Sequence, residues 1–354
     1  MQTVRLIVDS KDLNAPVSRA SIERAAAILR EGGTVAFPTE TVYGLGANAL
    51  RADAVQKIFE AKQRPSWDPV IVHVSDAEML KDVAAEVSEN ARRLMDAFWP
   101  GPLTLLLPRH GRIPGMVTAG RPRVGVRMPQ HPVAQALIRA AGVPVAAPSA
   151  NRFGHTSPTS AQHVADDLDG RIDAILDAGS EQTAHGLEST VIDTCEDPCV
   201  VYRPGVITLD DIRAVGVGAV AFNERELGRS AAREALPSPG VGLRHYAPRA
   251  RLILVEEGPE QVRQFEKLAR SEEFALEKLG LMLPEGFAGE PAGANVLVYR
   301  WGRWEDEEEL AQRLFAGLRQ LDAEGATVIL CPLPAAQGIG IAIRDRLLKA
   351  ARSE

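Results

Sequence analysis

The sequence predicts an α/β protein built from two domains. Its 354 residues are long for one domain and comfortable for two. Short apolar runs typical of buried strands alternate with amphipathic stretches typical of helices. Residues 219–238 lose this periodicity and gather polar residues. We therefore expect a first domain over residues 1–217, a linker over 218–249 and a second domain over 250–354.

The composition is that of a globular protein whose core is large enough to be stable without disulfide bonds or a structural metal ion. Hydrophobic residues make up 45% and charged residues 25%, with a formal net charge of -7. Cys195, Cys199 and Cys331 form no Cys-x-x-Cys pair, so we expect free thiols. No apolar run approaches the roughly 20 residues of a membrane span, and the first ten residues resemble a strand more than a signal peptide. We expect a cytoplasmic monomer with no membrane contact.

Periodicity and breaker residues place the elements of the first domain. Ser18 or Ser21 is the expected N-cap of its first helix. The expected helices are 16–31, 52–62, 77–98 and 131–141, with another opening near Ala161. The expected strands are 1–10, 34–37, 70–74, 103–107, 123–127, 143–147, 174–176 and 200–203. Residues 38–48 are expected to form a loop.

The second domain is predicted to be a small, parallel, Rossmann-like α/β domain, because strands and helices alternate in it. The expected strands are 251–255, 279–282, 295–299 and 328–330, and the expected helices 259–270, 307–323 and 341–350. Gly338-Ile339-Gly340 precedes the last helix, as in a nucleotide-binding turn. The third glycine and the partner acid of that motif are missing, so a structural turn is favoured.

The stretch from Phe37 to Asn48 reads Phe-Pro-Thr-Glu-Thr-Val-Tyr-Gly-Leu-Gly-Ala-Asn. Polar and glycine residues crowd behind a buried strand, where hydroxyls and backbone groups can face a ligand. By itself the stretch fits an ordinary turn equally well.

Basic residues stand at two places suited to anions. Lys62 and Arg64 lie at a helix end before Pro65, where they can complement the helix dipole or reach a triphosphate. Arg123 and Arg127 share one face of a strand, because side chains repeat every two residues. With Gly125 between them, we expect both arginines to point into one cleft.

A hydroxyl-rich loop follows the strand 143–147. It contains Ser149, Asn151 and Ser157 and leads into the helix near Ala161. Small residues let backbone N–H groups approach phosphates, and a helix N-terminus favours an anion. A capping loop explains the same residues, and both roles are compatible.

Seven motifs occur in order along the chain. They are the stretch 37–48, Lys62-Gln63-Arg64-Pro65, Trp99-Pro100-Gly101-Pro102-Leu103-Thr104, Val124-Gly125-Val126-Arg127-Met128-Pro129, Ala147-Pro148-Ser149-Ala150-Asn151, Glu188-Ser189-Thr190 and Arg203-Pro204-Gly205. Together with His245-Tyr246-Ala247-Pro248 they resemble the long, two-domain form of the YrdC-like threonylcarbamoyl-AMP synthases. That resemblance implies a twisted mixed sheet with helices around a concave basic cleft. It also implies synthesis of threonylcarbamoyl-AMP and pyrophosphate from L-threonine, bicarbonate and ATP, for threonylcarbamoyladenosine in tRNA.

The resemblance also implies roles for individual residues. The positions that hold L-threonine are Thr41, His73, Arg127, Ala147 and Ser189. The positions around ATP are Arg64, Asp68, Arg123, Ser149, Ser157, Arg203 and Tyr246. Lys62 and Arg64 would be the catalytic pair. Asp68 departs from the family, where an amide or a basic residue is expected. The linker would fold over the nucleotide as a lid and bring Tyr246 to ATP.

The expected cofactor is Mg²⁺ carried by the ATP phosphates, because no cluster of acids forms a dedicated metal site. The product would pass to downstream tRNA-modification enzymes. One alternative is a non-catalytic RNA-binding protein with weak RNA contact in the basic cleft, which the acidic charge and the 5% aromatic content disfavour. The other is a carbamoyl transferase of the hydrogenase-maturation type, whose cysteine-rich metal modules are missing here.

Overall fold

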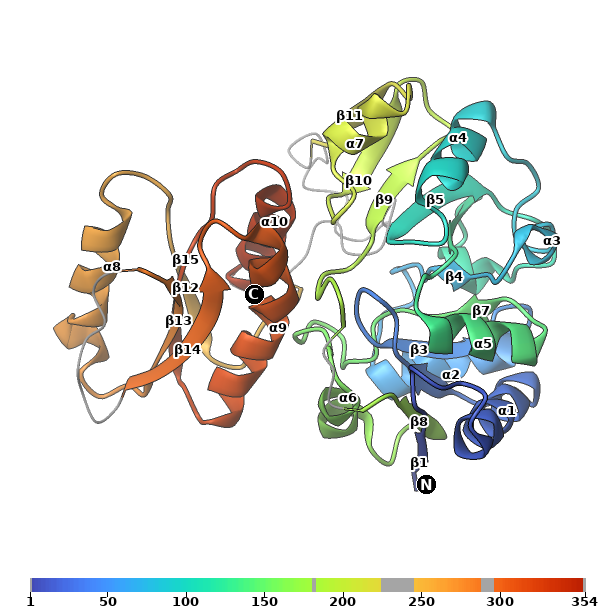
Figure 1. Ribbon diagram of the computed structural model, residues 1–354, viewed down its shortest axis with the longest axis horizontal. Helices are drawn as coiled ribbons and strands as arrows, with labels where there is room; N and C mark the ends of the chain where they lie inside the picture. The colour runs from blue at the N-terminus through green and yellow to red at the C-terminus, as the bar shows by residue number, and fades with distance from the viewer. Residues whose placement is uncertain (1, 180–182, 224–244, 288–295, 353–354) are drawn as a thin grey trace. The chain divides into compact units, whose positions relative to one another are not determined.

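The structure is a computed structural model that describes residues 2–179, 183–223, 245–287 and 296–352. The chain divides into two compact units (Figure 1). Unit 1 comprises Met1–Phe153, Pro158–Ala184 and Glu188–Gly242, and unit 2 comprises Gly154–Ser157, His185–Leu187 and Leu243–Glu354. Within the described ranges, no helix is long and apolar enough to cross a membrane.

Unit 1 is built on a mixed sheet of 11 strands in the order β1-β8-β2-β3-β7-β4-β6-β5-β9-β10-β11. The strands are β1 Val4–Ile7, β2 Val35–Phe37, β3 Gly44–Asn48, β4 Val72–His73, β5 Leu103–Pro108, β6 Arg123–Arg127, β7 Val145–Ala146, β8 Ala174–Asp177, β9 Thr190–Asp193, β10 Cys199–Arg203 and β11 Ala219–Ala221. The helices are α1 Pro16–Arg30, α2 Ala52–Lys62, α3 Ala77–Leu80, α4 Glu89–Phe98, the 3₁₀ turn η1 Gly115–Thr118, α5 Pro132–Ala141, α6 Ala161–Leu168 and α7 Leu209–Ala214. The mixed sheet expected from the resemblance is confirmed.

Two apolar cores cover opposite faces of this sheet. Val35 and Phe37 of β2 pack into one core together with α1 and α5, while Ala36 between them belongs to the other. This alternation follows from the two-residue repeat of a strand. The second core contains Val124 and Val126 of β6. As predicted, that leaves the arginines of β6 on the face opposite to its valines.

The start of the first helix differs from the prediction. Its preceding residue is Ala15, and Pro16 opens the helix, where a missing N–H removes no helical hydrogen bond. Ser18 and Ser21 are buried inside the helix. The hydroxyl of Ser18 instead accepts a hydrogen bond from the Asp9 backbone N–H at 3.0 Å.

Two further expectations for unit 1 were wrong. The single helix expected over 77–98 is divided into α3 and α4, and Ser88 caps α4 by accepting from the Ala91 N–H at 3.2 Å. The second half of the expected loop 38–48 is β3, which pairs antiparallel with β2. A Cβ at Gly46 would lie 2.8 Å from both Phe37 and Val145, so glycine lets the strand pass these side chains.

The segment after β10 is more ordered than the sequence suggested. Helix α7 was not predicted, and β11, inside the expected linker, pairs parallel with β10. The linker therefore cannot begin at residue 218 or 219. Residues 224–244, which carry most of the expected lid, lie outside the described residues.

Unit 2 confirms the expected parallel α/β domain. Its sheet has the order β12-β15-β13-β14, and every pair in it is parallel. Its elements are β12 Arg251–Val255, α8 Gln261–Ala269, the 3₁₀ turn η4 Glu272–Phe274, β13 Leu279–Glu285, β14 Val296–Arg303, α9 Glu307–Ala323, β15 Val328–Pro332 and α10 Gly340–Ala350.

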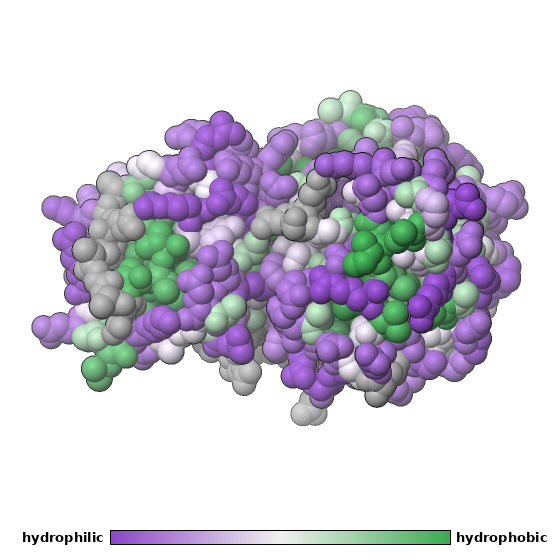
Figure 2. Space-filling view, turned by 60° about the horizontal axis from the view of Figure 1, so that its bottom comes forward, coloured by the Kyte–Doolittle hydropathy of each residue, from purple (hydrophilic) through white to green (hydrophobic). Residues whose placement is uncertain are grey.

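The face shown in Figure 2 is mostly hydrophilic, and hydrophobic residues are visible on both units. The exposed large hydrophobic side chains are Ile7, Val17 and Val220 in unit 1 and Val262, Leu276, Ile341 and Leu348 in unit 2. Single exposed apolar side chains of this kind are common on protein surfaces. All three cysteines are free, and only Cys195 is exposed, which confirms the expected free thiols.

Gly205 offers a test of how closely the motif after β10 packs. A Cβ at this position would lie 2.4 Å from the Thr190 backbone nitrogen and 2.9 Å from the Glu188 carbonyl oxygen. Backbone atoms cannot turn aside, so we expect Gly205→Ala to lower the free energy of unfolding by about 1–3 kcal/mol.

Urea denaturation would measure this loss. Gly218→Ala is the matched control, because nothing lies within 4 Å of its added Cβ. We expect the control to change the free energy of unfolding by less than about 0.5 kcal/mol. Equal effects of the two substitutions would contradict the packing argument.

Candidate functional site

A buried ion pair stands where the loop after β2 meets the end of β6. Arg127, the last residue of β6, places its Nη2 2.6 Å from Oε1 of Glu40, and both side chains are about 95% buried, with exposures of 4% and 5%. Its Nη1 donates to the Thr41 hydroxyl at 2.8 Å, and its Nε donates to the Gly101 carbonyl at 3.2 Å. The arginine thus joins two of the motifs found in the sequence.

The loop that carries Glu40 and Thr41 is held by its own residues. The hydroxyl of Thr39 donates to the Val42 carbonyl at 2.6 Å and accepts from the Thr41 backbone N–H at 3.2 Å. Beyond it, the Tyr43 N–H donates to the Pro158 carbonyl at 2.9 Å. The loop is therefore fixed against the hydroxyl-rich segment that follows β7.

His73 lies directly beside Arg127, because β4 pairs in parallel with β6 and the two residues are register partners. Its ring meets Phe37 edge-on at 6.2 Å between centroids. Burial, together with the smaller effect of the Arg127 charge, lowers the pKa of His73 to about 3, against an opposing effect of Glu40. The imidazole is therefore neutral at physiological pH.

Four buried polar atoms of these residues lack a well-directed hydrogen bond to the described residues, although two of them form the 2.6 Å ion pair. They are both carboxylate oxygens of Glu40, Nη2 of Arg127 and Nδ1 of His73. Buried polar atoms in native structures are nearly always hydrogen-bonded to protein or to ordered water, so these four atoms mark a place where water or a ligand can bind. Ala147, whose N–H donates to the Ile71 carbonyl at 2.8 Å, directly follows β7, the strand that lies between β3 and β4.

Ser189 connects to a second arginine. Its hydroxyl lies 2.7 Å from that of Thr104, and Arg203 donates to its carbonyl at 2.9 and 3.0 Å and to its hydroxyl at 3.1 Å. Ser189 and Arg203 are 1% and 4% exposed. The expected threonine and ATP positions therefore meet at this serine.

Lys62, Arg64 and Arg203 lie around a buried acid. Arg64 Nη2 is 2.8 Å from Asp68 Oδ2, and its guanidinium also donates to the carbonyls of Asp68 and Pro69. Burial raises the pKa of Asp68, against the opposing charges of Arg64, Lys62 and Arg203. The other oxygen, Oδ1, is buried and accepts no hydrogen bond from the described residues.

Lys62 fastens the cation group to the next motif. Its ammonium donates to the Ser149 carbonyl at 2.6 Å and to the Asn151 carbonyl, and its side chain is almost fully buried. Ser149 also forms a β-bridge with Gly44. The structure therefore brings the expected positions Lys62, Arg64, Asp68, Ser149 and Arg203 into one region of unit 1.

Arg123 is paired differently from Arg127. It forms ion pairs with Asp193, at the end of β9, and with Glu196 at 2.7 Å. Arg127 pairs with Glu40, so the two arginines share a strand face but contact different acids. ATP would have to compete with the carboxylates of Asp193 and Glu196 for the guanidinium of Arg123.

Ser157 and Tyr246 belong to unit 2. The Ser157 carbonyl accepts from Arg319 Nε at 3.3 Å. The Tyr246 ring stacks on Phe315 at 5.7 Å between centroids, with the Arg346 guanidinium 5.2 Å from its centroid. Both residues are buried and are held within unit 2 by these contacts.

Sequence reasoning did not assign a role to Glu40, Asp193 or Glu196. Glu40 lies inside the quoted stretch 37–48, and its only local signal is an acid beside a threonine in an otherwise uncharged loop. Its partner Arg127 is 87 residues away in the sequence, and only the tertiary structure brings the two together.

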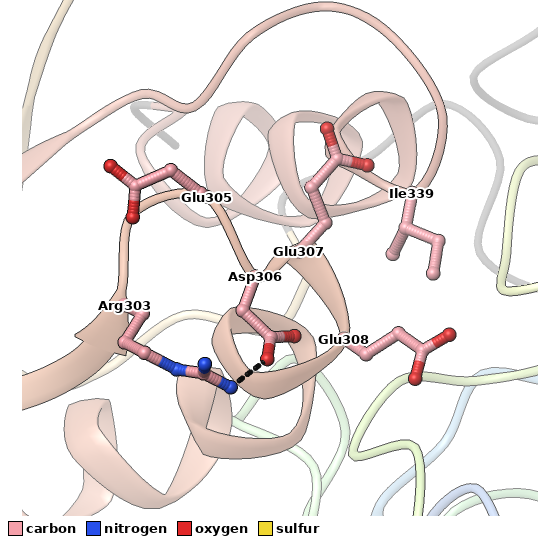
Figure 3. Close-up of a pocket in the computed structure, with 6 residues that line it drawn as sticks. All are labelled: Arg303, Glu305, Asp306, Glu307, Glu308 and Ile339. Atoms are coloured by element: carbon pink, nitrogen blue, oxygen red, sulfur yellow. Dashed lines mark hydrogen bonds and ion pairs between the residues drawn. The ribbon is translucent and has the colours of Figure 1, made fainter.

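A pocket in unit 2 is the other candidate site (Figure 3). It is lined by Arg303, Glu305, Asp306, Glu307, Glu308 and Ile339. Its acids would repel a phosphate, and the Glu307 carboxylate already accepts from the Gly340 N–H at 3.1 Å at the start of α10. Gly338-Ile339-Gly340 is thus a structural turn occupied by an internal anion. Within the described ranges, no group of three or more His, Cys, Asp or Glu residues could hold a metal ion.

The site in unit 1 combines an arginine and an acid beside a neutral histidine with a neighbouring group of buried cations. Such a site suits small ligands that carry carboxylate, ammonium and phosphate groups. The fold and site therefore define unit 1 as a domain that binds a small polar metabolite together with a phosphate compound.

Comparisons with known proteins agree with this class. Residues 27–205 match the family described as "Telomere recombination", and residues 207–352 match "Threonylcarbamoyl-AMP synthase, C-terminal domain". The threonylcarbamoyl-AMP synthase of Bacillus subtilis (strain 168) is 44% identical over 352 residues, 99% of this chain and 98% of the relative. That of Pyrococcus abyssi (strain GE5 / Orsay) is 43% identical over 330 residues, 93% of each chain.

A solved structure extends the likeness to three dimensions. "Crystal structure of P. abyssi Sua5 complexed with L-threonine" superimposes with a TM-score of 0.88 at 41% identity, over 99% of this chain and 98% of that chain. The chain belongs to the threonylcarbamoyl-AMP synthase family.

The low pKa of His73 has a measurable consequence. The unfolded chain takes up a proton near the ordinary pKa of 6.5, whereas the folded chain does so only near 3. Stability is therefore full above pH 6.5 and falls as the pH drops toward 3, by about 1.4 kcal/mol per pH unit.

Nitrogen NMR of the His73 ring between pH 8 and 5 would test this directly, and we expect a neutral ring throughout. Denaturation of the wild type and His73→Gln at pH 7.5 and 5.5 gives the second measurement. The wild type should lose about 1 kcal/mol more than the variant. A ring that titrates near pH 6.5 would refute the prediction.

Proposed function

We propose that this protein is an L-threonylcarbamoyladenylate synthase that joins L-threonine, bicarbonate and ATP and releases pyrophosphate. The observation that carries the proposal is the 44% identity to the B. subtilis enzyme over 99% of the chain. The buried Arg127, Glu40 and His73 beside the cations Lys62 and Arg64 supply the chemistry that these substrates need. An RNA-binding protein without catalysis is not favoured, since the relatives named here are synthases.

The reaction needs no nucleophile from the protein. The ammonium of threonine loses a proton, and its nitrogen bonds to the carbon of bicarbonate as water leaves, which gives a carbamate. A carbamate oxygen then bonds to the α-phosphorus of ATP, and the bond to the pyrophosphate oxygen breaks. Catalysis is therefore a matter of positioning the reactants and stabilising charge.

The residues divide into two groups by charge. Arg127 would hold the carboxylate of threonine through its planar fork, while Thr41, His73, Ala147 and Ser189 surround the rest of the amino acid. Lys62, Arg64 and Arg203 would stabilise the negative charge on the phosphates during transfer. Arg123, Ser149, Ser157 and Tyr246 remain proposed contacts to ATP.

Magnesium would enter with ATP. The buried and unbonded Oδ1 of Asp68 is a suitable oxygen ligand for it, and this explains an acid among three cations. Bound there, Mg²⁺ would neutralise phosphate charge. Asp68 offsets part of the positive charge of Lys62, Arg64 and Arg203. The summed charge of the four side chains then matches the charge of the Mg²⁺–ATP complex better than that of free ATP.

The product would pass to enzymes that transfer its threonylcarbamoyl group to adenosine in tRNA. We place the protein in the cytoplasm, because threonine, ATP and tRNA are available there. We also propose that it acts as a monomer. Any contact with RNA would be weak, given the net charge of -7.

The decisive experiment measures pyrophosphate release from ATP, with threonine and bicarbonate each present or omitted. Release that requires both supports the proposed reaction. Release with threonine alone would mean simple aminoacyl adenylation, and no release under any combination would overturn the proposal.

The role of Asp68 gives a separate prediction. In Asp68→Asn, ATP should bind more tightly without Mg²⁺, because a repelling carboxylate is gone, and the gain from adding Mg²⁺ should shrink at least about fivefold, about 1 kcal/mol. The amide oxygen can still accept from Arg64, so the fold should survive.

Calorimetric titration of ATP with Mg²⁺ or with EDTA measures this directly. Asp53→Asn, at an exposed pair with Arg51, is the control and should match the wild type. If Asp68→Asn kept the wild-type ratio of the two affinities, Asp68 would have no role toward the metal.

A further inference from the structure

The Glu40–Arg127 pair is close but incompletely bonded. The two atoms lie 2.6 Å apart, yet neither Nη2 of Arg127 nor either oxygen of Glu40 makes a well-directed hydrogen bond to a described residue. Backbone N–H groups of Glu40 and Gln130 lie near enough to influence the carboxylate, without bonding geometry. A purely structural buried pair would be expected to satisfy its hydrogen bonds, because the protein interior penalises those left unmade.

Glu40 is charged in spite of its burial. Burial alone would raise its pKa, but the charge of Arg127 and its contact with the carboxylate lower the pKa below the ordinary value. An anion and a cation therefore stand side by side, each with unused hydrogen-bonding capacity, next to the neutral His73.

An α-amino acid carries the complementary pair of groups. Its carboxylate accepts hydrogen bonds, its ammonium donates three, and both groups are attached to the same carbon atom. A β-hydroxyl adds a further donor, for which the unbonded Nδ1 of His73 is a suitable acceptor. The carboxylate of Glu40, Nη2 of Arg127 and Nδ1 of His73 thus offer three kinds of partner for the three polar groups of threonine.

We propose that Glu40 binds the α-ammonium group of the amino-acid substrate while Arg127 binds its carboxylate. This inference rests on the proposed function. It assigns to Glu40 the selection of an amino acid in its zwitterionic form. Insertion of a zwitterion leaves the net charge of the buried pair at zero. A hydroxy acid would add an uncompensated negative charge beside Glu40, and an amine would add a positive charge beside Arg127.

The interaction between Glu40 and the substrate changes from attraction to repulsion during the reaction. Conversion of the ammonium to a carbamate removes the positive charge that Glu40 binds and creates a negative one. Like charges in a buried site repel, so Glu40 favours movement of the carbamate away from itself. Glu40 therefore holds the amino acid before carbamate formation and weakens its hold afterwards.

The test is a calorimetric titration of the full chain, without ATP, by L-threonine and by (R)-3-hydroxybutyrate, which lacks only the amino group. We expect the wild type to prefer threonine by about 100-fold. In Glu40→Gln, threonine affinity should fall roughly 30-fold, as when one partner of a buried charge pair is removed, while hydroxybutyrate affinity stays within about threefold. Asp177→Asn, which removes the acid of the Arg5 pair elsewhere in unit 1, should behave as the wild type.

The alternative is that Glu40 only orients Arg127, and then both ligands weaken by the same factor in Glu40→Gln. That result, or no change for either ligand, overturns the inference and leaves the proposed function standing. Glu40→Asp covers the case in which Glu40→Gln does not fold: threonine should weaken more than hydroxybutyrate, and equal loss again overturns the inference. A wild type that binds no threonine would overturn the proposed function as well.

Discussion

Four buried cations tie the motifs of unit 1 together through backbone carbonyl groups. Lys62 donates to the carbonyls of Ser149 and Asn151, Arg127 to that of Gly101, and Arg203 to that of Ser189. Arg64 likewise closes the turn that follows its own helix. Each cation thus fixes the backbone of another motif, or of its own, through the carbonyl groups to which it donates. This dual use explains why motifs scattered over 170 residues of sequence form one region in space.

Electrostatics restricts which groups can surround these four buried cations. Buried cations are tolerated only when carbonyl groups or acids compensate them; Glu40 contacts Arg127 and Asp68 contacts Arg64. These carbonyl groups and acids of the protein therefore bind the cations as the proposed ligands would. Binding becomes an exchange of partners in a buried place, which costs less than the desolvation of bare charges.

The sequence was informative where a pattern is local. Helix α2 begins and ends as predicted at Ala52 and Lys62, and the alternation of valine and arginine in β6 gave the correct faces. Unit 2 was also predictable, because its parallel order follows from regular alternation of strand and helix. Failures arose where tertiary contacts decide. Gly44 and Gly46 look like a turn, yet packing against Phe37 makes them a strand, and no local signal links Glu40 to Arg127.

The order of strands in the large sheet has a consequence for how the protein is made. Among the described strands β1 lies at one edge of the sheet beside β8, so that Val4 pairs with Ala174. A ribosome adds on the order of 10 residues per second, so the first strand waits on the order of ten seconds for its partner. During synthesis this end of the chain presents unpaired backbone groups to the cell. Domain completion, and with it burial of the first strand, comes only after most of the ligand-binding loops have already been synthesised.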